Sequence, residues 1–181
     1  LAHLMRSRRS IRRFTDKTVD RDIIAGIIDT ARFAPSGHNL QNVDWIVVHD
    51  REKVTNLSKI TIDWMKQLLK DNHPAAEAYG VKHLIAAWRA GIDPICRNAS
   101  HVVVIHAPKQ KGSSMFDSMI AMSWFELLAA SKGLGTCAAG YVMACSAYWP
   151  PVAEELALPE GNVLYGALLL GYPKYDYHRI P

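Results

Sequence analysis

The chain carries clusters of cationic side chains near both of its ends. Residues 8–14 read RRSIRRF, and residues 171–181 read GYPKYDYHRIP. Guanidinium groups match phosphate oxygens in pairs and stay charged at ordinary pH. Because apolar or rigid residues bound both segments, the pattern predicts one anion held from two sides. The alternatives at this point are a solvated basic stretch and a nucleic-acid patch.

The cysteines and histidines give little support for a metal site or a disulfide framework. The cysteines Cys96, Cys137 and Cys145 are odd in number and include no CxxC pair, which argues against a disulfide framework and a structural metal site. We interpret each as a small buried apolar residue, although a redox role for Cys137 stays open. The eight histidines show no spacing such as HExxH, so no metal site is predicted.

Length and composition indicate one ordinary globular domain over residues 1–181. Hydrophobic residues make up 49% and charged residues 21% of the chain. The net charge of +4 fits a bound phosphate and is too small to indicate nucleic acid. No apolar run approaches the roughly 20 residues that span a bilayer. Unpaired cysteines favour a cytoplasmic location, and the start at Leu1 leaves an upstream segment open.

Helical and strand-like patterns alternate along the chain, and the elements that they predict must position the cationic clusters. Apolar spacing predicts helices over 20–33, 51–70, 117–132 and 151–158, and strands over 43–49, 101–107 and 162–170. Residues 34–39 read as a loop, and 72–98 as a partly helical lid or excursion. The helix over 117–132 is apolar almost all round, so a core or a partner subunit must cover it.

Four motifs give the chain a resemblance to a known family. They are RRSIRRF at 8–14, APSGHNLQ at 34–41, GLGTCAAG at 133–140 and GYP…RIP at 171–181. In this order and at these separations they resemble nitroreductase-family flavoproteins, most closely a branch that carries an N-terminal ferredoxin-like iron–sulfur segment. The resemblance implies an α+β nitroreductase-like fold: a central, mostly antiparallel sheet flanked by helices, in a homodimer with FMN at its interface.

The resemblance assigns the phosphate side of FMN to the two ends of the chain. In the family the first motif holds the phosphate and the ribityl chain, which implies roles for Arg8, Ser10 and Arg12. Arg9 would contribute through its backbone. Arg179 would be the second phosphate cation.

The second motif is implied to cover the flavin. In the family the Pro-Ser pair comes from the other subunit, and the Asn contacts a flavin edge, usually from its own subunit. An Asn amide suits that edge because it carries a donor and an acceptor, but a left-handed turn is the alternative for Asn39. His38 either contacts substrate or lies at the surface. The cofactor-binding residues implied here are Pro35, Ser36, Gly37, Asn39 and Gln41.

The third motif is implied to lie along the flavin ring. In relatives the segment matching Ala138, Ala139 and Gly140 runs beside the ring, with a backbone N–H near N5. Small residues and the glycines at 133, 135 and 140 would let the backbone approach a flat ligand.

The implied function is FMN-dependent oxidoreduction. The acceptor would be a small organic molecule, nitroaromatic or quinone-like, reduced by ping-pong transfer, with the chemistry on the flavin and no catalytic side chain. The electron donor would be NAD(P)H or a ferredoxin-type protein. Dehalogenation, flavin fragmentation and dehydrogenation occur in the same family. Outside enzymes, the alternative is a flavin-binding electron-transfer or partner-docking module.

Overall fold

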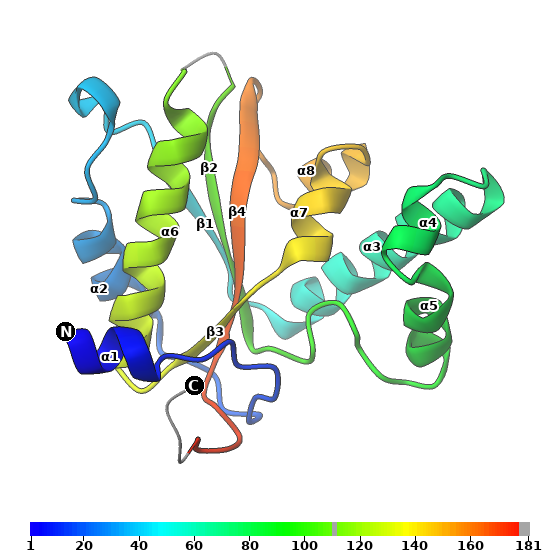
Figure 1. Ribbon diagram of the computed structural model, residues 1–181, viewed down its shortest axis with the longest axis horizontal. Helices are drawn as coiled ribbons and strands as arrows, with labels where there is room; N and C mark the ends of the chain where they lie inside the picture. Colours follow the sequence, from blue (N-terminus) through cyan, green and yellow to red (C-terminus); the bar gives the residue numbers. More distant parts are fainter. Residues whose placement is uncertain (110–111, 178–181) are drawn as a thin grey trace.

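A four-stranded sheet runs through the centre of the computed structural model, which describes residues 1–109 and 112–177 (Figure 1). The spatial order is β1-β2-β4-β3, and all neighbouring strands are antiparallel. The predicted central antiparallel sheet flanked by helices is confirmed. The strands are β1 (Asp44–Val48), β2 (His101–Pro108), β3 (Gly135–Ala138) and β4 (Asn162–Gly171).

The four helices predicted above are confirmed, each within three residues at its ends. The short α1 and α7 were not predicted, because they hold too little periodicity; α8 is as short as α1, but prolines mark its start. In the part of the chain that the structure describes, no helix has both the length and the apolar character needed to cross a bilayer. The helices are α1 (Ala2–Ser7), α2 (Arg21–Ala31), α3 (Arg51–Lys70), α4 (Ala75–Ala78), α5 (Val81–Arg89), α6 (Ser114–Ser131), α7 (Gly140–Ser146) and α8 (Pro150–Glu155).

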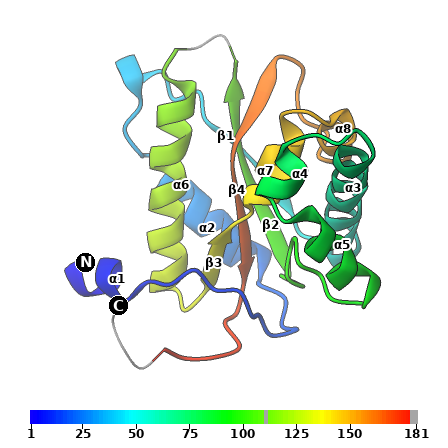
Figure 2. The same cartoon turned by 45° about the vertical axis from the view of Figure 1, so that its right-hand side comes forward.

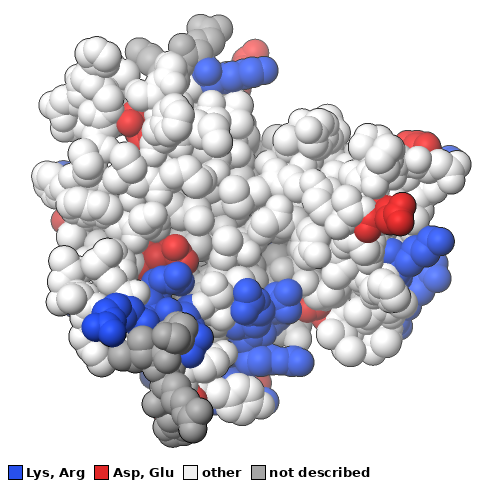
Figure 3. Space-filling model, in the orientation of Figure 1, with Lys and Arg blue, Asp and Glu red and all other residues white. Residues whose placement is uncertain are grey.

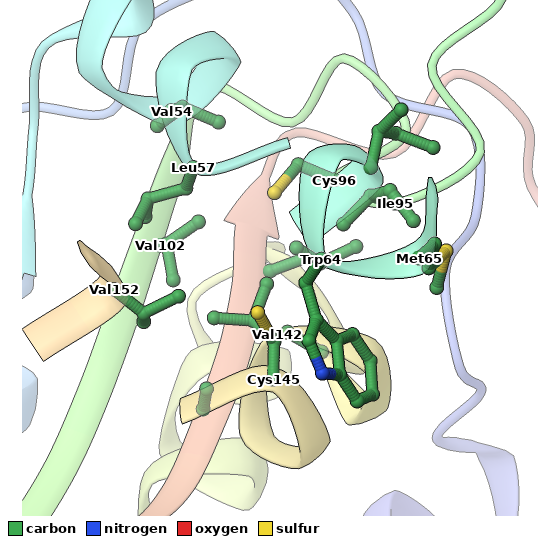
Figure 4. Close-up of a cluster of buried hydrophobic side chains, with 14 of the residues drawn as sticks. Val54, Leu57, Trp64, Met65, Ile95, Cys96, Val102, Val142, Cys145 and Val152 are labelled. Carbon is green, nitrogen blue, oxygen red and sulfur yellow. The ribbon is translucent and has the colours of Figure 1, made fainter. Parts of the chain in front are cut away.

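Strand β2 separates two hydrophobic cores. Successive side chains of a strand point to opposite faces of the sheet. Val102 and Val104 accordingly join a core formed with α3, α5, α7 and α8, whereas Val103 and Ile105 join a core formed with α2 and α6. Figure 4 shows part of the first core, where Trp64 of α3 lies close to α7. Burial on both faces explains why β2 reads as a continuous apolar run.

Residues 72–98 are partly helical, as predicted. Both α4 and α5 pack against α3, and the loop after α5 is fixed by one carboxylate. Asp93 accepts hydrogen bonds from the N–H groups of Ile95 and Cys96, at 2.9 and 3.0 Å, and from the Ser58 hydroxyl at 3.0 Å. The loop is therefore anchored to α3, and its action as a lid remains a prediction.

A buried histidine makes the fold sensitive to acid. His101 is fully buried; its Nε2 accepts the Val19 N–H at 2.9 Å, and its Nδ1 lies 3.1 Å from the His49 carbonyl oxygen. The His49 ring stacks on it, with centroids 4.3 Å apart. Burial, with a contribution from His49, lowers the pKa of His101 from 6.5 to about 4. The folded state therefore favours the neutral ring.

We expect this histidine to cost stability as the pH falls from about 6.5 towards about 4. The unfolded chain takes up the proton first, so the free energy of unfolding should fall by about 2 kcal/mol between about pH 7 and about pH 5. Urea unfolding at each pH measures it. His101→Gln should flatten this slope, whatever its effect on absolute stability; an unchanged slope in the variant would assign the effect to another group.

Candidate functional site

Residues 8–12 run alongside β3. Ser10 pairs with Thr136 in parallel, and the Ile11 N–H donates to the Thr136 carbonyl oxygen at 2.8 Å. A Cβ added at Gly135 would lie 2.6 Å from the Ile11 side chain, closer than real contacts allow. Gly135 is therefore needed for packing against Ile11. Its predicted second role, letting the backbone approach a flat ligand, stays a prediction.

The Arg8 side chain is oriented by a carboxylate of α6. Arg8 Nη1 lies 3.5 Å from Glu126 Oε1, and the Thr136 hydroxyl donates to the same oxygen at 3.2 Å. The Arg8 side chain remains 30% exposed, so its guanidinium is held in place and still accessible to an anion. Sequence reasoning missed Glu126 and Thr136. The available signal was that Glu126 is the one charged residue between Ser118 and Ser131.

The two cationic ends meet in space, as the motif pattern predicted. The Lys174 N–H donates to the Arg13 carbonyl oxygen at 3.0 Å, and the Arg9 guanidinium lies 5.4 Å from the centre of the Tyr177 ring. Arg179 lies outside the described residues, so its role as a phosphate cation stays a prediction.

A cavity of about 240 Å³ opens between these segments. It is bounded by α1, by residues 8–11, by the C-terminal end of α6 with the turn after it, and by residues 173–177. Figure 3 shows Lys and Arg side chains gathered on the lower part of this face, where the N-terminal segment runs in Figure 1. Arg12 is exposed. The region therefore combines an accessible hollow with positive charge, as an anionic group requires.

The third motif includes β3, the strand that lies next to the cationic segment. Ala138 ends β3 and Gly140 begins α7. The Ala139 N–H is already used, because it donates to the Ala167 carbonyl oxygen at 2.8 Å. Gly140 is exposed, and a Cβ added there would meet nothing within 4 Å. The first N–H groups of a helix have no partner inside it. Gly140 is thus the residue of this motif best able to offer an N–H to a flat ligand.

The loop of the second motif is held together by its own hydrogen bonds. The Asn39 N–H donates to the Ser36 carbonyl oxygen, the Gln41 N–H donates to Ser36 Oγ, and Gln41 Nε2 donates to Asn39 Oδ1, each at 3.0 Å. Asn39 has a φ of 53°, so the left-handed turn that was its alternative is observed. Hydrogen bonds therefore join Ser36, Asn39 and Gln41 into one unit. His38 is exposed, and its contact with substrate stays a prediction.

This loop lies at the opposite end of α6 from Arg8. The Gly37 N–H donates to Asp117 Oδ1 at 2.9 Å, in the first turn of α6. Asp117 and Glu126 are nine residues apart, which corresponds to about 13 Å along a helix. Figures 1 and 2 show the same separation, with the loop at one end of α6 and α1 at the other. One chain thus brings the first and third motifs together and leaves the second apart.

Helix α6 presents an apolar face to solvent between these two ends. Phe116, Ile120 and Trp124 are 70%, 38% and 39% exposed, and they follow each other at intervals of four residues, so they share one face. On the opposite side Ala121, Phe125 and Ala129 are buried against the sheet. The core therefore covers only one side of the helix. The sequence had predicted that a core or a partner subunit must cover it.

The cysteines are structural. All three are buried, and none forms a disulfide. Burial raises the pKa of Cys96 and of Cys145 to about 12, so both remain protonated thiols. The prediction of small buried residues is confirmed; the cytoplasmic location inferred from them stays a prediction.

An aromatic hollow of about 340 Å³ lies next to α3 and α4. Trp64 and Tyr79 line it with ring centroids 6.0 Å apart, and Tyr79 meets Tyr141 edge to face at 6.1 Å. Exposed Tyr148 lies at its opening. Tyr141 directly follows Gly140, so aromatic rings connect the hollow to the third motif.

Comparison with known proteins agrees with this geometry. The family model described as "Nitroreductase family" matches residues 5–172. A protein of Archaeoglobus fulgidus, provisionally named an NADH dehydrogenase/NAD(P)H nitroreductase, is 27% identical over 93% of this chain and 82% of its own. A nitroreductase with bound FMN from Desulfitobacterium hafniense superposes with a TM-score of 0.79 at 22% identity, over 99% and 93% of the two chains. An FMN-dependent nitroreductase from Clostridium difficile gives 0.69 at 25% identity, over 98% and 90%.

Proposed function

The chain belongs to the nitroreductase family, and from that premise we propose that it is an FMN-dependent oxidoreductase of small organic acceptors. The observation that carries the proposal is the placement of two motifs along β3. Ser10 pairs with Thr136, and Ala138 lies two residues further, roughly 7 Å along the strand. A cationic segment and an open small-residue segment are therefore within reach of one elongated anionic cofactor.

The residues present fit FMN. Arg8 is oriented by Glu126 and accessible, so it suits the phosphate, with Ser10 and Arg12 on the same segment. The open space at Gly140 admits the edge of a flat ring. FMN, when bound, supplies the hydride and electron transfer. The chain binds the phosphate, orients the ring and offers a backbone N–H to it.

We further propose a homodimer formed through α6. A two-fold axis perpendicular to α6 pairs the helix with its copy in an antiparallel manner, because such an interface uses the same patch on both subunits. Each loop at the start of α6 then lies near the Arg8 end of the partner's helix. The second motif would thereby complete the partner's site, from Pro35 to Gln41. Since Ser36 and Asn39 form one unit, both would come from the same subunit.

The proposed acceptor rests on the aromatic hollow near Gly140, and the proposed donors rest on a relative's name and on surface charge. The hollow lined by Trp64 and Tyr79 adjoins Gly140 through Tyr141, which favours an aromatic acceptor and an enzyme over a docking module. The donor proposed is NAD(P)H, as in the name of the Archaeoglobus relative. A ferredoxin-type donor is the second candidate, because Arg8 and Arg9 line the cavity and further Lys and Arg side chains gather on the same face (Figure 3).

The spectrum of the purified protein tests this function. We expect protein reconstituted with FMN to be yellow, to lose its visible absorbance anaerobically with NAD(P)H, and to recover it with a nitroarene or a quinone. Reduction by reduced ferredoxin alone would identify the second donor. A bound flavin that reacts with no such acceptor would favour the electron-transfer module, and protein that binds no FMN would contradict both.

A further inference from the structure

The loop from Ser36 to Gln41 is strained and needs support from outside. His38, Asn39 and Gln41 have φ angles of 52°, 53° and 47°. Non-glycine residues adopt such angles uncommonly, and the conformation persists only where the surrounding structure holds it. Its internal hydrogen bonds fix the shape of the loop, but not its position on the molecule.

One carboxylate ties the loop to the body of the molecule. Asp117 is 3% exposed, and its Oδ1 accepts the Gly37 N–H at 2.9 Å. A charged acceptor makes this a strong hydrogen bond. The loop comes close to Ser113 here: a Cβ added at Gly37 would lie 2.7 Å from Ser113 Cβ. A side chain at position 37 would therefore push the loop away from α6.

The burial of Asp117 is not explained by packing alone. Among the described residues its Oδ2 has no hydrogen-bond partner, and neither does the indole Nε1 of Trp45. Both residues line a cavity of about 330 Å³ next to the loop, together with Ser36 and Gln41. Burying a carboxylate with one oxygen unpartnered is costly. An apolar residue would cost less at this position, so the role of Asp117 lies in the hydrogen bond to Gly37.

We propose that Asp117 is a positioning residue of the cofactor site, acting through Gly37 on the loop that carries Ser36 and Asn39. The inference rests on the proposed function, in which this loop covers the flavin of the partner subunit. The exposed residue Phe116 of the proposed dimer face is adjacent to Asp117 in the same helix. The turn of α6 that holds Phe116 and Asp117 thus contributes to the subunit contact and positions the loop over the partner's flavin site.

Three variants separate positioning from packing. Asp117→Leu removes the acceptor and keeps a similar volume; we expect FMN to bind at least about tenfold more weakly. Asp117→Asn keeps an acceptor oxygen, and its affinity should stay within about threefold of the wild type. Ser118→Ala is the control, since Ser118 is buried in the same turn and its hydroxyl has no partner in the described part of the chain. It should not alter FMN affinity.

A second pair of variants tests the same contact without touching the carboxylate. Gly37→Ala should weaken FMN binding, because the new methyl group meets Ser113 Cβ and Oγ. Adding Ser113→Gly removes both atoms and should restore most of the affinity. If Asp117→Leu fails to fold, this pair tests whether the contact between the loop and α6 controls FMN affinity.

The measurements are FMN titration by quenching of flavin fluorescence, the visible spectrum of bound flavin, and the melting temperature of the FMN-free protein. A lower melting temperature with unchanged FMN affinity in Asp117→Leu would overturn the assignment, as would equal weakening by Asp117→Asn. Wild-type protein that binds no FMN would instead overturn the proposed function, and the assignment with it. The wild-type titration therefore distinguishes the two failures.

Discussion

Replacing Arg8 with alanine is expected to weaken FMN binding by about 10- to 100-fold. A hydrogen bond between charged partners contributes about 1.5–3 kcal/mol, and the Arg8 guanidinium is already oriented by Glu126. Titration of the FMN-free protein at fixed ionic strength measures the loss. Arg13→Ala is the matched control: it removes the same charge from the same exposed segment but is not among the residues expected to bind the cofactor.

Combining Arg8→Ala with Arg179→Ala tests whether the phosphate is held from two sides. We expect the double variant to bind FMN more weakly than either single variant. The Arg8–Glu126 pair is long and partly exposed, so stability should change little, by less than about 1 kcal/mol. Unchanged affinity in the double variant, with Arg13→Ala indistinguishable from it, would remove the phosphate role from both ends.

Placing a charge in the middle of the exposed α6 face is expected to separate the dimer and remove most FMN binding with it. In Trp124→Glu a carboxylate would be buried without a partner at the proposed interface, at a cost of several kcal/mol. The dimer should then dissociate at micromolar concentration. FMN affinity should fall at least about tenfold, because the loop of the second subunit no longer reaches the site.

Sedimentation velocity and FMN titration on the same samples check this result. Ile92→Glu is the control, because Ile92 is an exposed apolar residue that lies outside α6. It should leave both assembly and affinity unchanged. A Trp124→Glu protein that remains dimeric would place the interface elsewhere, and a monomer with full FMN affinity would show that one chain holds the cofactor alone.

Much of the fold could be predicted because its longest elements carry clear patterns. Helix α3 was predicted at its observed bounds, and β2 was visible as an apolar run, since both faces of that strand are buried. Strand β3 was missed. Its four residues are mostly small and show no alternation; they form a strand because β4 pairs with them on one side and Ser10 on the other. Such elements depend on tertiary context more than on local sequence.

The candidate site was only partly predictable for a similar reason. Short motifs identified Arg8 and Gly140, but not the Glu126 carboxylate that orients Arg8 from more than a hundred residues away. The resemblance implied that Ser36 and Asn39 serve flavins of different subunits, and that division stays a prediction; the structure shows the two residues hydrogen-bonded within one loop. Sequence spacing holds no information on a contact such as that between Arg8 and Glu126.

The placement of residues 8–12 beside β3 has a consequence for the solubility of the protein. Strand β3 is the last in the sheet order, so its outer side would otherwise present unpaired backbone groups. Open sheet edges of this kind recruit other chains and lead to aggregation. Ser10 and Ile11 occupy that side through their backbones. The peptide proposed to supply the phosphate-binding arginine is therefore also an edge protector, and we expect a protein shortened past Ile11 to lose the proposed cofactor site and its barrier against self-association together.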